Sequence, residues 1–190
     1  MKQILNRLIN HETISSEEAK QILINISKGD YNQSQIASFL TVFMMRSITL
    51  DELKGFRDAL LELCVPVDLS AYNPIDLCGT GGDGKDTFNI STLSSFITAA
   101  AGVPVAKHGN YGVSSACGSS NVLESLGVTF SNDVDFLERA IASAGICVLH
   151  APLFHPAMKN IAPIRQSLGV KTFFNMLGPM VNPSAPKNQM

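Results

Sequence analysis

Hydrophobic residues in the first part of the chain recur at helical spacing. The clearest repeat places one apolar face on a single helix, through Ile36, Phe39, Leu40, Phe43 and Met44. Residues 15–18, 32–35 and 49–52 each resemble a capping box, in which side chains satisfy the free N–H groups at a helix start. The pattern predicts a small all-helical domain over residues 1–69, with Met44 and Met45 in its core or in a subunit contact.

From about residue 70 the pattern changes to short apolar runs separated by glycine-rich and polar loops. Residues 74–78, 103–106 and 146–149 are typical of buried strands, and helical segments are predicted at 92–101, 119–126 and 134–144. Strands that alternate with helices form a parallel sheet covered by helices. The predicted fold class is therefore α/β, with a larger parallel-sheet domain over residues 70–190 and a hinge at 64–74.

The loop after the first predicted strand, residues 78–92, is suited to binding phosphate. Four glycines without a Cβ can turn successive N–H groups toward an anion: Gly79, Gly81, Gly82 and Gly84. Asn89, Ser91 and Thr92 can cap the helix that follows, whose positive end also favours an anion. The loop lacks the P-loop pattern, and Asp83 stands where a dinucleotide fingerprint needs room. A metal-bound polyphosphate fits better, and a plain glycine turn is the alternative.

A second polar loop, residues 107–115, follows the next predicted strand. Lys107 supplies a cation, Gly109 and Gly112 supply backbone freedom, and hydroxyls come from Ser114, Ser115 and Ser119. Parallel strands end at the same edge of a sheet, where open α/β folds bind ligands. Together the two loops predict a ligand with two phosphate sites.

The bulk composition is that of an ordinary globular chain. Hydrophobic residues make up 45% and charged residues 16%, with a formal charge of −2. Lysines and arginines are scattered, which argues against a nucleic-acid partner, and no apolar run reaches the roughly 18 residues of a membrane span. The four cysteines form no Cys-x-x-Cys pair. We expect a cytoplasmic protein that binds neither nucleic acid nor membrane.

Five motifs, taken in order, carry a specific resemblance. They are residues 79–83, 89–92, 107–110 with 114–115, 151–158 followed by Arg165, and 174–179 followed by 182–183. In this order and spacing they resemble the anthranilate phosphoribosyltransferase family, of the nucleoside phosphorylase and phosphoribosyltransferase type 3 superfamily. The resemblance implies a helical domain that also takes in about residues 163–180, and a homodimer formed through the helical domains.

The resemblance also implies an activity. The family transfers the phosphoribosyl group of 5-phosphoribosyl 1-pyrophosphate to anthranilate in tryptophan biosynthesis, giving N-(5-phosphoribosyl)anthranilate and pyrophosphate with Mg²⁺ as cofactor. Because the aromatic amine is a poor nucleophile, the barrier falls mainly through stabilisation of the departing pyrophosphate. No side chain is expected to act as a general acid or base.

Site residues follow from the same resemblance. The donor would be held by Gly79, Gly82, Asp83, Thr87, Asn89, Ile90, Ser91, Thr92, Lys107, His108, Gly109, Asn110, Tyr111, Gly112, Val113, Ser114, Ser115 and Ser119. Anthranilate would be held by Gly79, Asn110 and Arg165, with His108 and His155 lining the pocket. Ser91 is the implied Mg²⁺ contact. From the residues alone, a solvated surface arginine is the favoured interpretation of Arg165, and the resemblance reverses it.

Three departures from the family pattern are present. Tyr111 stands where the family commonly has arginine, and Ala116 where it often has lysine. The chain stops at Met190, before an acidic pair that the family uses for magnesium, and its last residues show no closing strand. We therefore expect an N-terminal portion with an incomplete, C-terminally truncated α/β domain. A pyrimidine nucleoside phosphorylase-like enzyme, or a catalytically incomplete phosphate-binding or dimerisation fragment, are the alternatives.

Overall fold

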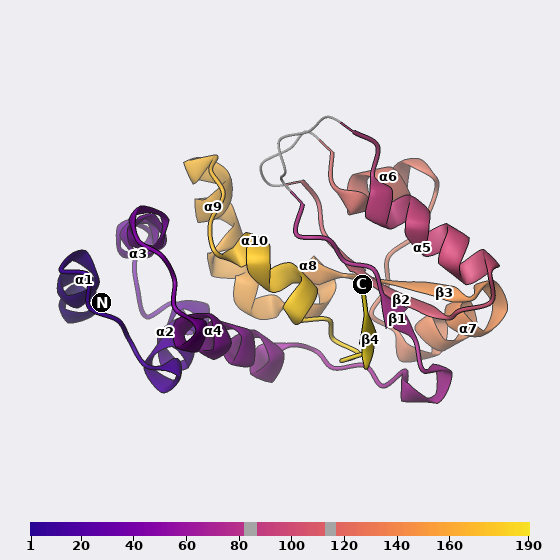
Figure 1. Cartoon of the computed structure of the whole chain (residues 1–190), viewed down its shortest axis with the longest axis horizontal. Helices are drawn as coiled ribbons and strands as arrows, with labels where there is room; N and C mark the ends of the chain where they lie inside the picture. The colour runs from indigo at the N-terminus through magenta and orange to yellow at the C-terminus, as the bar shows by residue number, and fades with distance from the viewer. Residues whose placement is uncertain (82–86, 113–116) are drawn as a thin grey trace. The chain divides into compact units, whose positions relative to one another are not determined.

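The computed structural model describes residues 1–81, 87–112 and 117–190 (Figure 1). The chain forms two compact units. The helical unit comprises Met1–Cys64 and His155–Leu177, and the sheet unit comprises Val65–Phe154 and Gly178–Met190. Across the described ranges, none of the helices has the length and apolar character needed to cross a membrane.

The helical unit begins its longer helices at the predicted capping boxes. Its elements are α1 (Lys2–Ile9), α2 (Ser16–Lys28), α3 (Gln33–Met45), α4 (Leu50–Leu63), the 3-10 helix η2 (Pro156–Asn160), α9 (Ala162–Leu168) and α10 (Phe174–Leu177). Ser15, Asn32 and Thr49 each accept a hydrogen bond from the backbone three residues on, and the reciprocal bond is present. All three predicted capping boxes are confirmed.

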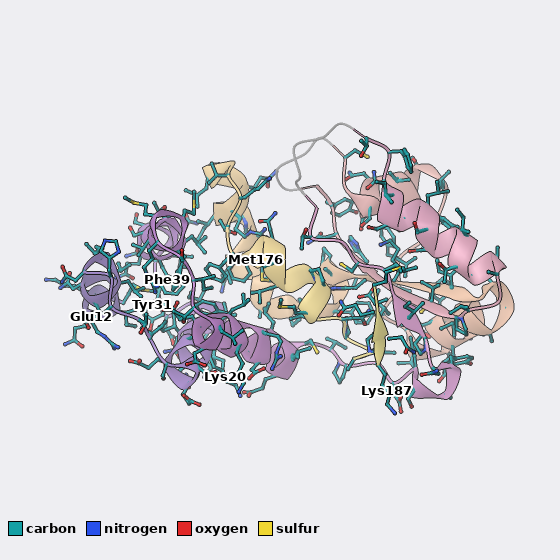
Figure 2. All side chains as sticks on the ribbon, in the orientation of Figure 1. Glu12, Lys20, Tyr31, Phe39, Met176 and Lys187 are labelled. Carbon is teal, nitrogen blue, oxygen red and sulfur yellow. The ribbon has the colours of Figure 1, made fainter. Side chains whose placement is uncertain are left out.

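Aromatic rings fill the core of the helical unit. Phe39 of α3, labelled in Figure 2, lies edge-on to Phe43 with ring centroids 5.0 Å apart, and Phe56 stacks on Phe173 at 4.5 Å. Met44 and Met45 are 44% and 80% exposed, so they do not lie in the core, and the alternative, a subunit contact, stays a prediction. They belong to the last turn of α3, after its buried stripe has ended at Phe43.

Helices α2 and α4 approach closely at Gly55. A Cβ at this position would lie 2.2 Å from the carbonyl oxygen of Ser16 and 2.8 Å from the Cβ of Ala19. Both distances are shorter than van der Waals contact, so only glycine allows the two helices their present separation.

The sheet unit contains a parallel sheet whose described strands run in the order β3-β2-β1-β4 (Figure 1). The strands are β1 (Ile75–Asp76), β2 (Val105–Gly109), β3 (Ile146–His150) and β4 (Asn188–Gln189). The first is shorter than predicted. The second is shifted toward the C-terminus, because its ladder with β3 continues from Val105↔Ile146 to Gly109↔His150. The expectation of no closing strand is wrong, since β4 pairs with β1.

Helices pack on the sheet and enclose its apolar core. They are η1 (Ser70–Tyr72), α5 (Ile90–Ala100), α6 (Ser119–Ser125), α7 (Val134–Ala144), α8 (Ala151–Phe154) and η3 (Gly178–Met180). In Figure 1, α5 and α7 lie on opposite sides of the strands. The helix predicted at 92–101 begins two residues earlier, whereas 134–144 is confirmed. Core residues include Val67, Leu69, Ala106, Leu137, Ile141 and Leu149.

Candidate functional site

The first and second loops start from neighbouring strands of one sheet. Strands β1 and β2 are parallel and paired at Ile75↔Val105, so the chain leaves both strands at the same edge. The ammonium group of Lys107 on β2 donates a hydrogen bond to the carbonyl oxygen of Leu77, just after β1, at 3.4 Å. The structure therefore brings the two predicted phosphate loops together where they begin.

Three polar residues at this edge are buried. Asp76, Lys107 and His108 are 0%, 2% and 3% exposed. Burial raises the pKa of the Asp76 carboxyl, against the opposing effect of hydrogen bonds from Asn182 and His108. Burial likewise lowers the pKa of Lys107. The edge thus holds charged groups in a poorly hydrated setting, in which an electrostatic contact with a ligand is strong.

Lys107, His108 and Gly109 were predicted in a loop, and this prediction is wrong. All three belong to β2, and their side chains or Cα atoms are buried. The second loop begins only at Asn110, which is exposed. Nδ1 of His108 lies 2.9 Å from the carbonyl oxygen of Gly178. This contact is within the sheet unit and holds the imidazole against the chain segment that precedes β4.

The N-terminus of α5 lies against the first loop. A Cβ on Gly79 would lie 2.9 Å from the Ser91 hydroxyl oxygen, so glycine is needed for this approach. Asn89 occupies the N-cap position, but its side chain makes no capping hydrogen bond. Thr92 is buried within the helix, while Thr87 and Ile90 are exposed. The expected capping by the Asn89 side chain is therefore not formed, and the N-terminus of α5 is of the kind that can bind an anion.

The second loop is anchored at both ends by one side chain, which sequence reasoning missed. Oδ1 of Asn121, on α6, accepts hydrogen bonds from the backbone N–H of Gly112 at 3.2 Å and of Gly118 at 2.9 Å. Ser119 donates its hydroxyl to the carbonyl oxygen of Asn110 at 3.2 Å. The only sequence signal for Asn121 was its place three residues after a glycine at a helix start.

Tyr111 is tied to the same helix. Its hydroxyl donates to Oε1 of Glu124 at 2.6 Å, and this hydrogen bond raises the pKa of the Tyr111 hydroxyl. The Tyr111 ring lies edge-on to His150 at 4.9 Å, and His150 in turn stacks on Phe130 at 4.2 Å. Ser120 Oγ lies 2.9 Å from Nδ1 of His150. Tyr111 thus fixes the start of the second loop through aromatic packing and a charge-assisted hydrogen bond.

Five predicted donor residues lie outside the described residues. They are Gly82, Asp83, Val113, Ser114 and Ser115. The remaining predicted donor residues all belong to the sheet unit.

Arg165 and His155 belong to the helical unit. Arg165 lies on α9 and is 7% exposed, so it is not a solvated surface arginine. One of its terminal nitrogens, Nη2, donates to Oδ1 of Asn175 at 3.1 Å, and burial lowers the pKa of its guanidinium to about 10. His155 is buried directly before η2. Both are placed as buried polar groups, as expected of residues that line a pocket.

The described residues offer one hydroxyl that could bind a metal ion, but not a complete set of protein ligands. Among them, no group of three or more His, Cys, Asp or Glu side chains could hold a metal ion. Ser91 carries a hydroxyl at the start of α5, beside the backbone of Gly79. Mg²⁺ usually keeps several waters and shares substrate phosphate oxygens, so one protein hydroxyl is compatible with it. The donor set fits a magnesium ion held largely by a polyphosphate.

Comparison with known proteins gives consistent relatives. The chain is 78% identical to the anthranilate phosphoribosyltransferase of Flavobacterium psychrophilum and 58% identical to that of Bacteroides thetaiotaomicron, each over 190 residues. These matches cover the whole chain, but 58% and 57% of the relatives. The chain therefore spans a little over half the length of the curated relatives that it matches.

Solved structures show the same fold. The Thermus thermophilus anthranilate phosphoribosyltransferase matches with a TM-score of 0.86 and 36% identity, over 98% of this chain and 56% of that one. The Saccharomyces cerevisiae enzyme, in complex with PRPP and Mg, matches with a TM-score of 0.82 and 28% identity, over 94% and 54%. Both confirm the predicted α/β fold class with an N-terminal helical part.

Two family models cover nearly the whole chain. Residues 2–64 match the helical bundle domain of a glycosyl transferase family, and residues 71–190 match the a/b domain of that family. The resemblance drawn from the five motifs is confirmed by these matches and by the relatives. The chain therefore belongs to this glycosyl transferase family, and the relatives that it matches are anthranilate phosphoribosyltransferases.

Proposed function

We propose that this chain is the N-terminal portion of an enzyme that transfers the phosphoribosyl group of 5-phosphoribosyl 1-pyrophosphate to anthranilate. The observation that carries the proposal is the shared edge of β1 and β2. There, Gly79, the N-terminus of α5 and the buried Lys107 lie next to one another within the sheet unit. Backbone N–H groups and a buried cation at one sheet edge are suited to a polyphosphate donor.

The donor would contact both loops. In the first, Gly79, Gly82, Asp83, Thr87 and residues 89–92 hold the donor, and in the second, residues 107–115 with Ser119 do so. The N–H groups of α5 and the ammonium of Lys107 would meet the negative charge that grows on the leaving pyrophosphate. Such fixed donors stabilise a transition state because they need no reorganisation when the charge appears.

The acceptor would meet Gly79, Asn110 and Arg165. Arg165 offers a planar guanidinium that matches the carboxylate of anthranilate in two parallel hydrogen bonds. Its burial strengthens that contact, since less water competes for the charge. His108 and His155 would line the pocket without acting as general bases. An anthranilate-type acceptor, though not these residue roles, is supported by the Saccharomyces cerevisiae structures in complex with 4-fluoroanthranilate.

Magnesium would be held by Ser91 and the donor. Bound there, the ion would supply positive charge beside the pyrophosphate oxygens. We further propose that the protein is cytoplasmic and forms a homodimer through its helical unit, as the family resemblance implies.

The decisive assay follows anthranilate fluorescence in the presence of the chain, 5-phosphoribosyl 1-pyrophosphate and magnesium. Loss of fluorescence with release of pyrophosphate supports the proposal. Uridine with phosphate is the parallel substrate pair, and its cleavage without loss of anthranilate would instead identify a nucleoside phosphorylase. Donor binding, measured by calorimetry on the same sample, separates a third case: binding without turnover would identify a phosphate-binding fragment and show that residues 1–190 do not suffice for the reaction. A longer chain that also fails to consume anthranilate would contradict the proposal.

A further inference from the structure

Arg165 is a buried cation whose partners in the helical unit are neutral. Its guanidinium donates to the amide oxygen of Asn175 and lies 5.3 Å from the ring centroid of Phe174. Within the described ranges, no carboxylate lies at ion-pair distance from Arg165, and its Nε has no hydrogen-bond partner. Burial of a cation without a carboxylate is costly. The unused Nε–H and the uncompensated charge therefore suit an anion that comes from outside the chain.

The amide oxygen of Asn175 fixes the direction of the guanidinium. This one oxygen accepts from Nη2 of Arg165 at 3.1 Å and from the backbone N–H of Thr172 at 3.2 Å. The second bond holds the Asn175 side chain against the backbone at the start of α10, so its oxygen cannot follow the guanidinium if Arg165 moves. A rigid acceptor of this kind is what orients a ligand-binding side chain.

The charge of the acceptor is as important as its position. An aspartate at 175 would offer an oxygen in the same place, but it would also neutralise Arg165. A neutral amide orients the guanidinium and leaves its positive charge for a ligand. We propose that Asn175 is the positioning residue of the anthranilate carboxylate site, selected as a neutral acceptor that aims Arg165 without satisfying its charge. The inference rests on the proposed function, which assigns Arg165 to the carboxylate of anthranilate.

A simpler role for Asn175 would be to cap the turn at Thr172. A cap of this kind works equally well with aspartate, because the carboxylate accepts the same N–H hydrogen bond. The two roles therefore predict opposite results for one substitution, Asn175→Asp. As a cap, aspartate preserves both stability and ligand binding. As a positioning residue, aspartate stabilises the fold through a new ion pair with Arg165 and weakens anthranilate.

The experiment measures two quantities for four variants of the chain. The variants are Asn175→Asp, Asn175→Ala, Arg165→Ala and, as control, Met176→Ala, whose side chain is 37% exposed on the same turn (Figure 2). The quantities are the thermal midpoint of unfolding and the dissociation constants of anthranilate and anthranilamide, the neutral carboxamide analogue. Pyrophosphate and magnesium replace the reactive donor in the binding assays, so that anthranilate is not consumed, and donor affinity is recorded separately.

For Asn175→Asp we expect a higher thermal midpoint than wild type, together with at least about tenfold weaker binding of anthranilate. Binding of anthranilamide, which lacks the charge, should be nearly unchanged. Asn175→Ala should lower the midpoint and weaken anthranilate about tenfold, because the guanidinium loses its guide. Arg165→Ala should remove the preference for anthranilate over anthranilamide. Met176→Ala should match wild type in both quantities.

Wild-type affinity for anthranilate in Asn175→Asp, or a thermal midpoint that does not rise, would overturn the inference. If the wild-type chain binds neither anthranilate nor anthranilamide, the proposed function is contradicted, independently of the role of Asn175. The inference is then decided by the midpoint: a rise in Asn175→Asp supports the orienting contact with an uncompensated Arg165, and no rise overturns it.

Discussion

The backbone N–H of His108 donates a hydrogen bond to the carboxylate of Asp76 at 3.1 Å, inside the sheet unit. The ends of β1 and β2 are thus joined through a fully buried acidic side chain. Strand pairing alone links β1 to β2 at a single register position, Ile75↔Val105. Asp76 therefore supplies a connection at the edge of the sheet that the short ladder lacks.

This relationship predicts a pH-dependent contribution to stability. Because burial raises the pKa of Asp76, the folded chain takes up a proton at higher pH than the unfolded chain. Asp76 makes its full contribution to the free energy of unfolding below its unfolded-state pKa, about 3.9. That contribution is lost as the pH rises through the higher folded-state pKa. The free energy of unfolding of wild type, relative to Asp76→Asn, should therefore grow as pH falls from 7 toward 4.

Urea unfolding at a series of pH values measures this difference. Asparagine keeps an acceptor for the His108 N–H but cannot titrate, so it is the matched reference. Wild-type and variant curves that stay parallel across the range would show that Asp76 titrates normally and contradict the prediction.

Asn121 should control the affinity of the proposed donor. Asn121→Ala removes the acceptor of two backbone N–H groups, and we expect up to about thirtyfold weaker binding of 5-phosphoribosyl 1-pyrophosphate with magnesium, from two hydrogen bonds of about 1 kcal/mol each. Asn121→Asp keeps an acceptor oxygen and should retain most of the affinity. Ser125→Ala, an exposed change on the same helix, is the control for α6. Calorimetry compares the three, and equal affinity in Asn121→Ala and wild type would refute the anchoring role.

Gly55→Ala should destabilise the helical unit despite the better helix propensity of alanine. The added Cβ would meet the Ser16 carbonyl at 2.2 Å, and backbone cannot move aside as a flexible side chain can. Overpacking of this kind costs about 1–3 kcal/mol, which exceeds the roughly 1 kcal/mol gained from propensity. Urea denaturation gives the comparison. Gly178→Ala, where an added Cβ would meet no atom within 4 Å, should leave the midpoint nearly unchanged.

Ser91→Ala should raise the magnesium concentration needed for half-maximal donor binding, because the proposed magnesium ion loses the Ser91 hydroxyl as a ligand. Donor titrations at several magnesium concentrations measure this requirement. Ser94→Ala, on the same helix but in its second turn, should behave as wild type. Unchanged magnesium dependence in Ser91→Ala would remove this hydroxyl from the proposed metal site.

The local features of the fold could be predicted because each depends on neighbours in sequence. Ser15, Asn32 and Thr49 act through residues three positions away, so their capping boxes were visible in the sequence. The extent of β2 could not be predicted from the sequence, since Lys107 and His108 are held in a strand by pairing with β3, some forty residues later. Polarity suggested a loop there, and tertiary pairing overrode it.

The same distinction applies to the candidate site. Arg165 is compatible with a surface position in sequence, because only packing in the helical unit buries it. Asn175 and Asn121 escaped notice for a related reason: their hydrogen-bond partners depend on turns whose geometry the sequence does not specify. The two phosphate loops stay a prediction, drawn from glycines and hydroxyls whose effect on backbone conformation is a local property.

The second loop is anchored through backbone N–H groups, which separates its main-chain attachment from its side chains. Asn121 holds Gly112 and Gly118 by their main chains, so these two hydrogen bonds do not depend on which side chain occupies position 111. Tyr111 has its own attachment, to Glu124 and His150. A substitution at position 111 would therefore change the side chain presented beside the proposed anion site and remove this attachment, while both main-chain hydrogen bonds to Asn121 stay available.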